Sequence, residues 1–127
     1  MKRGAVYLAA QDVGSPRPRS ESHAAQRAHL EERSILRPVV LVSRDAINRY
    51  SAVVLICPLV EAASVQKLYP SDVQVHAPEG GLSADGVVLT GQLRALARAQ
   101  LVRYLGELSA EVMREIDQAL RITLDLE

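Results

Sequence analysis

The sequence predicts an α+β fold that is mainly β: a small barrel-like sheet, a long insertion after its first strand, and one C-terminal helix. Two observations predict it. Short apolar runs rich in Val, Leu and Ile are separated by turn residues, which is typical of a sheet of five or six short strands. The last part of the chain instead repeats apolar residues with helical spacing. A length of 127 residues fits one domain, spanning 1–127.

The first expected strand covers residues 6–9, and the insertion follows it at about 15–34. The insertion opens with Gly and Pro turn residues, and its second half is rich in helix-favouring Ala, Glu, Gln and Arg. Its apolar positions are too sparse for a packed helix face. We therefore expect a mobile or marginally helical segment with a functional role, because structureless loops of this length are uncommon otherwise.

Residues 38–42 and 52–59 are apolar at every position. Such runs suit strands that are buried on both faces, as in a closed barrel. The polar segment 43–51 between them predicts a turn. Three later segments predict shorter strands, of which the last two are either separate or one interrupted strand: 72–77, 86–90 and 93–97.

The C-terminal helix is predicted by a single apolar face. Ser109 is a natural N-cap for it, and Glu111 in the first turn opposes the helix dipole. Asp117 and Arg121 stand four residues apart in the order that favours an ion pair. The apolar face consists of Val112, Met113, Ile116, Ala119, Leu120, Thr123 and Leu124.

Composition excludes several classes of function. The single Cys57 cannot form an internal disulfide and favours a reducing compartment. No apolar run approaches the ~20 residues of a membrane span, so we expect a cytoplasmic protein without membrane contact. His23, His29 and His76 lack the spacing of metal ligands, and no Gly-rich phosphate loop precedes a helix, so neither a metal nor a cofactor is expected.

The remaining candidates for a functional site are arginine side chains. The first 49 residues hold nine Lys or Arg against five Asp or Glu, which permits an anionic partner. Arg37 comes directly before the apolar run 38–42. Arginines at the rim of a barrel can hold phosphates, although the alternative for any single one is a solvated surface role. The others near expected strand ends are Arg44, Arg49, Arg94, Arg98 and Arg103.

Segments along nearly the whole chain, except about residues 15–34, resemble the MazF/PemK family of toxins. None is specific alone, but their order and spacing together are. They are MKRG (1–4), RPVVLVS (37–43), DAINR (45–49), ICPL (56–59), YP (69–70), GVVL (86–89), QLRAL (92–96), LGELS (105–109) and DQAL (117–120).

The resemblance implies an SH3-like β-barrel of the MazF/CcdB type that assembles as a homodimer. It implies the toxin of a toxin–antitoxin pair, a sequence-specific endoribonuclease that cuts single-stranded RNA, such as mRNA, at short sequence motifs without a metal ion. The 2′-hydroxyl of the RNA attacks the adjacent phosphate and leaves 2′,3′-cyclic phosphate and 5′-hydroxyl ends. The partner it implies is a cognate antitoxin whose acidic, extended tail lies across the RNA groove.

The resemblance also implies site residues. Arg37 occupies the position of the family's catalytic Arg. The family carries a Thr or Ser just after its Pro-Leu dipeptide, where this chain has Val60. Ser64, four residues later, is the expected replacement hydroxyl, with Ser43 and Ser51 as weaker candidates. The family's loop Glu, near its catalytic Arg, corresponds to Glu32 or Glu31, for which a solvated helix position is the alternative.

RNA contacts are expected from polar and aromatic residues around the same groove. Tyrosines can stack on unpaired bases, although packing in the core or rim is the alternative for each. The expected RNA-binding residues are Arg44, Asn48, Arg49, Tyr50, Tyr69, Gln92 and Arg94.

Two other functions remain open. Val60 leaves room for a catalytically weak or inactive family member that acts as a protein- or RNA-binding module. A related group of toxins with the same barrel poisons a topoisomerase, but the Arg37-Pro38 start of the apolar run resembles the nuclease branch.

Overall fold

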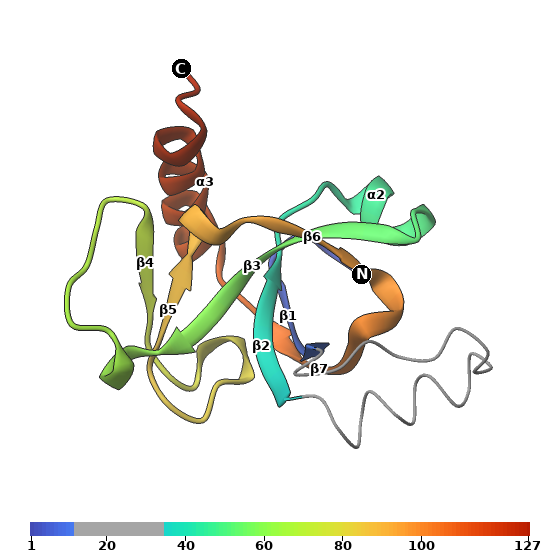
Figure 1. The fold of residues 1–127 in the computed structure, drawn as a ribbon, viewed down its shortest axis with the longest axis horizontal. Helices are drawn as coiled ribbons and strands as arrows, with labels where there is room; N and C mark the ends of the chain where they lie inside the picture. Colours follow the sequence, from blue (N-terminus) through green and yellow to red (C-terminus); the bar gives the residue numbers. More distant parts are fainter. Residues whose placement is uncertain (12–34) are drawn as a thin grey trace.

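The computed structural model describes residues 1–11 and 35–127. The insertion expected at 15–34 lies outside the described residues. The described part contains seven strands and two α-helices (Figure 1). The strands are β1 (Ala5–Gln11), β2 (Ile35–Leu41), β3 (Val53–Glu61), β4 (Asp72–Val75), β5 (Gly86–Leu89), β6 (Arg94–Ala97) and β7 (Leu101–Glu107). The helices are α2 (Asp45–Tyr50) and α3 (Ala110–Leu124), and short 3-10 turns are η1 (Ala62–Ser64), η2 (Glu79–Gly81), η3 (Thr90–Gln92) and η4 (Arg98–Gln100).

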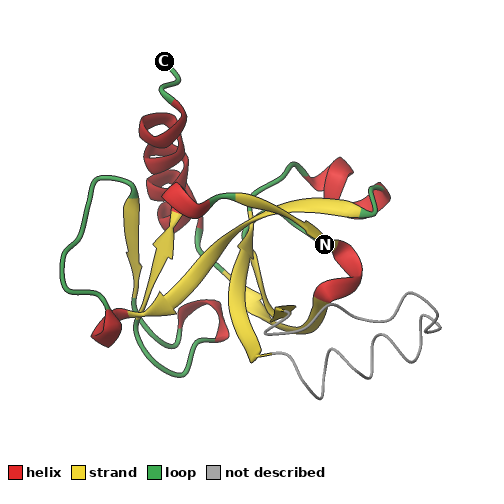
Figure 2. Ribbon diagram, in the orientation of Figure 1, coloured by secondary structure: helices red, strands yellow, loops and turns green. Residues whose placement is uncertain are grey.

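All strand pairs are antiparallel, in the order β4-β5-β3-β2-β1-β7, with β6 paired to β3 off this path. The path does not close on itself, because no pairing joins β4 to β7 in the described part of the chain. The mainly β architecture with one C-terminal helix, seen in Figure 2, confirms the expected fold class. Strand β3 holds the sheet together, because successive parts of it pair with β6, β2 and β5.

The apolar run on β2 is buried on both faces, as expected, whereas in the run on β3 only the second half is, because Val53 and Leu55 are exposed. On β2, Val40 packs into a core that includes Ile116 of α3, whereas Val39 and Leu41 pack into a second core with Val54 of β3. Side chains of successive strand residues point to opposite faces, so a strand between two cores is apolar throughout. This explains why 38–42 shows no alternation of apolar and polar residues.

Helix α3 begins where the sequence predicts. Ser109 is the N-cap, and its hydroxyl oxygen accepts a hydrogen bond of 3.2 Å from the Val112 backbone N–H. The predicted Asp117–Arg121 pair is wrong. Asp117 accepts from Nη2 of Arg3 at 2.5 Å instead, and Arg121 donates to Gln118. The half-buried Asp117 faces the body of the protein, where Arg3 reaches it, so a tertiary contact replaces the local pair.

Two elements were not expected from the sequence. Segment 43–51, predicted as a turn, contains helix α2, whose end is held from outside: Nη1 of Arg98 donates to the Asn48 and Arg49 carbonyl oxygens at 3.3 and 2.7 Å. Strand β7 was missed because its pairing with β1 has two register shifts. Such bulges break the alternation that identifies a half-buried strand.

No helix among the described residues is long and apolar enough to span a membrane.

Candidate functional site

A break in the sheet creates the candidate site. Strands β2 and β3 pair only from Val39–Pro58 to Leu41–Ile56. Beyond Pro58, β3 pairs with β5, whereas the first residues of β2 pair only with β1. Pro38, the next residue of β2, has no backbone N–H and cannot donate a hydrogen bond to extend the ladder. The two strands separate from this residue onward.

A pocket of about 650 Å³ opens where the strands separate. If the ladder continued in register, Arg37 would lie opposite Val60, and both residues line the pocket. Ser64 of η1 lines it as well. Three residues singled out from the sequence for one reaction are thus brought to one cavity. The remaining lining residues are Leu8, Leu36, Pro38, Leu59, Glu61, Gly81, Leu82, Ser83, Ala84, Asp85, Gly86 and Leu105.

One wall of the pocket is the η2 turn, which packs closely on β7. Gly81 has a φ of +75°, and a Cβ atom there would lie 2.0 Å from the Leu105 carbonyl oxygen. Only glycine allows both this backbone conformation and this close approach. The close packing brings Gly81, Leu82 and Leu105 into the lining, so the turn and β7 together form part of the pocket wall.

The ionisable side chains described around the pocket are one cation and two carboxylates: Arg37, Glu61 and Asp85. Arg37 is exposed at the start of β2, so its guanidinium is available to a phosphate. Because no second cation lines the described part of the pocket, an anion bound there depends on Arg37.

Asp85 is held in place by hydrogen bonds. Its Oδ1 accepts from the Ala77 backbone N–H at 2.8 Å, and its Oδ2 lies 3.4 Å from Nδ1 of His76. The Ala77 N–H, followed by His76, lowers the pKa of the Asp85 carboxyl. Both contacts favour the ionised form of Asp85. The carboxylate thereby links the segment that follows β4 to the start of β5.

The Ser64 hydroxyl donates to the Glu61 backbone carbonyl at 2.7 Å. This bond fixes η1 against the end of β3. It also occupies the hydroxyl proton, while the oxygen lone pairs remain able to accept. Val60, which replaces the expected hydroxyl residue, is partly buried and offers no polar atom.

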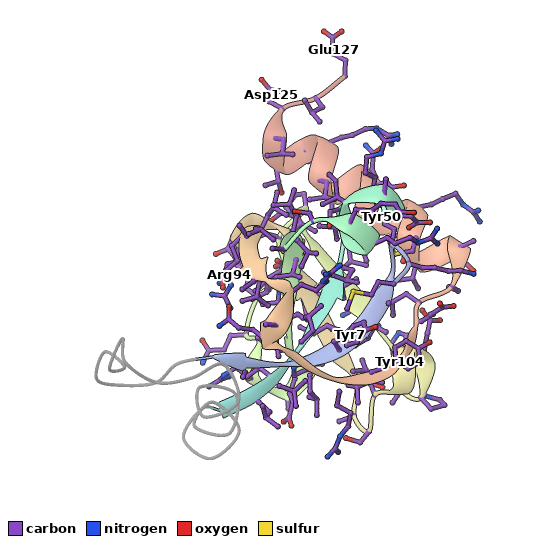
Figure 3. The ribbon with its side chains drawn as sticks, turned by 90° about the vertical axis from the view of Figure 1, so that its right-hand side faces the viewer. Tyr7, Tyr50, Arg94, Tyr104, Asp125 and Glu127 are labelled. Atoms are coloured by element: carbon purple, nitrogen blue, oxygen red, sulfur yellow. The ribbon has the colours of Figure 1, made fainter. Side chains whose placement is uncertain are left out.

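The expected RNA-binding residues lie away from the pocket or around its margin. Arg44, Arg49 and Tyr50 are exposed at helix α2, which follows the other end of β2 (Figure 1). From Arg37 to Leu41 the strand rises about 13 Å at 3.3 Å per residue. In Figure 3, Tyr50 and Arg94 lie on opposite sides of that view. One chain therefore does not collect all of these residues around one pocket.

Asn48 is not available to RNA. It is fully buried, and its amide nitrogen donates to the Ser43 carbonyl at 2.8 Å while its amide oxygen accepts from the Ser43 hydroxyl. The polar segment 43–51 suggested a surface turn, but this pairing folds it into α2 with Asn48 inside. We therefore correct the expected role of Asn48 from RNA contact to structural residue, and Ser43 loses its place as a candidate hydroxyl for the same reason.

The remaining candidates are placed as follows. Tyr69 is exposed before β4, and Nζ of Lys67 lies 5.3 Å from the centroid of its ring. Gln92 and Arg94 are exposed at η3 and β6.

The other candidate hydroxyl and the loop carboxylates are not among the described residues that line the pocket. Ser51 lies beside α2, where its hydroxyl accepts from the Val53 N–H at 3.1 Å. Glu31 and Glu32 lie outside the described residues.

The sequence did not identify Glu61 and Asp85 as pocket residues. Glu61 directly follows Val60, so its adjacency to a candidate position was the available signal. Asp85 gave none, because only the pairing of β4 with β5 and of β5 with β3 places it there. Within residues 1–11 and 35–127, no three His, Cys, Asp or Glu side chains are grouped to hold a metal ion.

The sequence of this chain is similar to those of known proteins. The family model described as PemK-like, MazF-like toxin of type II toxin–antitoxin system matches residues 2–124. The chain is 33% identical over 126 residues to a protein named endoribonuclease MazF from Staphylococcus epidermidis, covering 99% of this chain and 92% of that protein.

Solved structures give the same fold. The chain is similar to an endoribonuclease in complex with its cognate antitoxin from a mycobacterial species, with a TM-score of 0.71 at 24% identity, covering 100% of this chain and 97% of that one. It is also similar to MazF from Deinococcus radiodurans, with a TM-score of 0.64 at 26% identity, covering 98% and 94%.

Proposed function

Because this chain belongs to the family of PemK-like, MazF-like toxins of type II toxin–antitoxin systems, we propose that it is an endoribonuclease that cuts single-stranded RNA without a metal ion. The observation that carries the proposal is the pocket between the diverging strands β2 and β3, which is lined by Arg37, Val60 and Ser64. Arg37 is the family's catalytic position by sequence order, and it is the cation in the described lining. The chain acts on mRNA in the cytoplasm.

The proposed reaction is an internal phosphoryl transfer. The 2′-oxygen attacks the adjacent phosphorus, the bond from phosphorus to the 5′-oxygen breaks, and the ends are a 2′,3′-cyclic phosphate and a 5′-hydroxyl. The phosphorane that forms carries extra negative charge on its equatorial oxygens. Arg37 donates to those oxygens as a planar fork of N–H groups, which stabilises the transition state more than the ground state.

Val60 has no hydroxyl group, so the polar contact that Thr or Ser makes at this position in the family needs another source. We propose that Ser64 supplies a polar contact to the phosphate, since it lines the same pocket as Arg37. Its proton is held by the Glu61 carbonyl, so this contact requires the hydroxyl to turn away from that bond. Glu32, from outside the described residues, is the proposed loop carboxylate.

The partners follow from the family. We propose a homodimer, which would bring exposed Arg44, Arg49 and Tyr50 of one protomer together with groups that a single chain leaves apart. Tyr50 and Tyr69 stack on unpaired bases, and Gln92 and Arg94 contact the RNA from η3 and β6. A cognate antitoxin with an acidic extended tail competes for the same cationic groups; a relative of known structure is bound to its antitoxin.

A second candidate function rests on Val60. A chain that has lost a donor to the transition state is slower by about 10²–10³-fold in comparable sites. The alternative is therefore a weak or inactive member that binds RNA or protein through the same surface.

The test is cleavage of a long, unstructured RNA in excess EDTA by wild type, Arg37→Ala and Arg114→Ala. Arg114 is an exposed arginine of α3 and serves as a matched control. We expect wild type and Arg114→Ala to cut equally and Arg37→Ala to lose at least 10²-fold in rate. Wild type that binds RNA without cutting it would instead favour the second function.

A further inference from the structure

We propose that Glu61 is the group that accepts the proton of the attacking 2′-hydroxyl. This role rests on the proposed ribonuclease function and adds a catalytic residue to it. The observation behind it is the position of Glu61 at the end of β3, one residue beyond Val60, where it lines the same pocket as Arg37. If the β2–β3 register continued, Glu61 would lie opposite Leu36, which also lines the pocket.

The backbone of Glu61 is fixed on both sides. Glu61 pairs with Gly86 in the β3–β5 ladder, and the next N–H, of Ala62, donates to the Asp85 carbonyl at 2.9 Å. Its own carbonyl accepts from the Ser64 hydroxyl. A base must be held at hydrogen-bond distance from the proton that it takes, and a side chain on a rigid strand end meets this need better than one on a long loop.

The Glu61 carboxylate is uncommitted, in contrast to that of Asp85. No hydrogen bond or ion pair to the Glu61 side chain is present among the described residues, and the residue is exposed to the cavity. Asp85 carries two contacts that stabilise its ionised form, from Ala77 and His76. A carboxylate stabilised in this way is a weaker proton acceptor, so of the two pocket carboxylates Glu61 suits the role.

The step balances as follows. The proton of the 2′-hydroxyl moves to a carboxylate oxygen of Glu61 as the bond from the 2′-oxygen to phosphorus forms. The bond from phosphorus to the 5′-oxygen then breaks, and that oxygen takes a proton from a water molecule. The hydroxide left by the water removes the proton from Glu61, which returns to its carboxylate form. Arg37 stays protonated throughout and holds the equatorial oxygens.

Two other ionisable side chains line the same pocket as Glu61 in the described part of the chain: Arg37 from β2 and Asp85, which directly precedes β5. His76, after β4, contacts Asp85. Protonation of Glu61 removes the acceptor, so cleavage falls as the pH is lowered. This fall in rate is assigned to Glu61 if it disappears in Glu61→Gln and persists in the control variant.

The experiment compares wild type with Glu61→Gln, Glu61→Asp, Glu32→Gln and the control Glu111→Gln, in which an exposed α3 residue outside this pocket is changed. Single-turnover cleavage in excess EDTA is measured across the acid to neutral pH range. Affinity is measured on the same RNA with a 2′-deoxy nucleotide at the cleavage position, which cannot react. We expect Glu61→Gln to bind this RNA as wild type does and to cleave the unmodified RNA about 10²–10⁴-fold more slowly. We also expect it to lose the acid limb of the pH profile, which is the fall in cleavage rate as the pH is lowered. Glu61→Asp keeps the limb at a reduced rate.

The outcomes separate the two proposals. Wild type that cleaves, with Glu61→Gln equally fast and retaining the acid limb, overturns the role of Glu61 and leaves the ribonuclease function standing. Loss of the limb in Glu32→Gln instead assigns the base to that residue and also overturns it. Wild type that does not cleave overturns the ribonuclease function and this role with it. Thermal unfolding of each variant excludes loss of the fold as the cause.

Discussion

Arg37 on β2 and Val60 on β3 occupy positions that would pair directly if the ladder between their strands ran two residues further. It ends at Val39–Pro58, and the pocket opens between them. The site therefore exists because these two strands separate, and the position across from Arg37, the cation of the described lining, is occupied by the apolar Val60.

Val60→Thr is expected to raise the cleavage rate. Threonine has nearly the shape of valine, so the pocket is kept while a hydrogen-bond donor is placed opposite Arg37. A donor to a developing charge contributes up to about 10²–10³-fold, so we expect a gain of tenfold or more. Single-turnover cleavage measures it, with Val60→Ala as a control that changes shape without adding a hydroxyl. An unchanged rate in Val60→Thr would mean that the hydroxyl function is already supplied elsewhere.

Ser64→Ala tests whether Ser64 supplies the hydroxyl group that Val60 lacks. If the Ser64 hydroxyl contacts the phosphate, its removal slows wild type but has little effect once Val60→Thr has provided a nearer hydroxyl. The two changes are then non-additive, and a double-mutant cycle on the cleavage rates detects this. Equal losses in both backgrounds would instead assign Ser64 only to holding η1 through the Glu61 carbonyl.

Asp85→Asn is expected to lower stability near neutral pH and not at low pH. Folding lowers the pKa of Asp85 through the Ala77 N–H and His76, so its contribution is present above its ordinary value of 3.8 and is lost as the pH falls through the lower folded value. Urea unfolding midpoints over this range measure the difference, with Glu111→Gln as the control. A difference that is constant with pH would contradict the assignment.

Cys57 is expected to resist alkylation in the folded protein. It is fully buried, and burial raises the pKa of its thiol to about 12, an effect that the charge of Arg3 opposes. At pH 8 the thiolate fraction is then about 10⁻⁴, and the thiolate is the reactive form. Mass spectrometry after iodoacetamide treatment should show slow modification of native protein and rapid modification in urea. Equal rates in the two conditions would show that the core opens readily.

Most strands and α3 were predictable because their signals are local. The apolar runs on β2 and β3 and the spacing on α3 reflect which face each residue buries, and Ser109 caps its helix within three residues. Helix α2 and strand β7 were not predictable, since Arg98 stabilises the first from fifty residues away and bulges conceal the second.

The candidate site was only partly predictable. The resemblance indicated, by order along the chain, Arg37 as the catalytic position and Val60 as the position that lacks the family's hydroxyl group. Asn48 was misjudged because a short polar segment does not reveal that its amide pairs with Ser43 inside the fold. Glu61 and Asp85 were missed since nothing local marks them as neighbours of Arg37.

By itself, the sequence determined the mainly β fold, the C-terminal helix and the family, because periodicity, capping and ordered motifs are properties of neighbouring residues. Only the tertiary structure decided which carboxylates share a pocket with Arg37, which polar residue is buried, and where the sheet opens. These depend on strand register, which joins residues such as Arg37 and Val60 from separate strands, and register is set by the packing of the whole sheet.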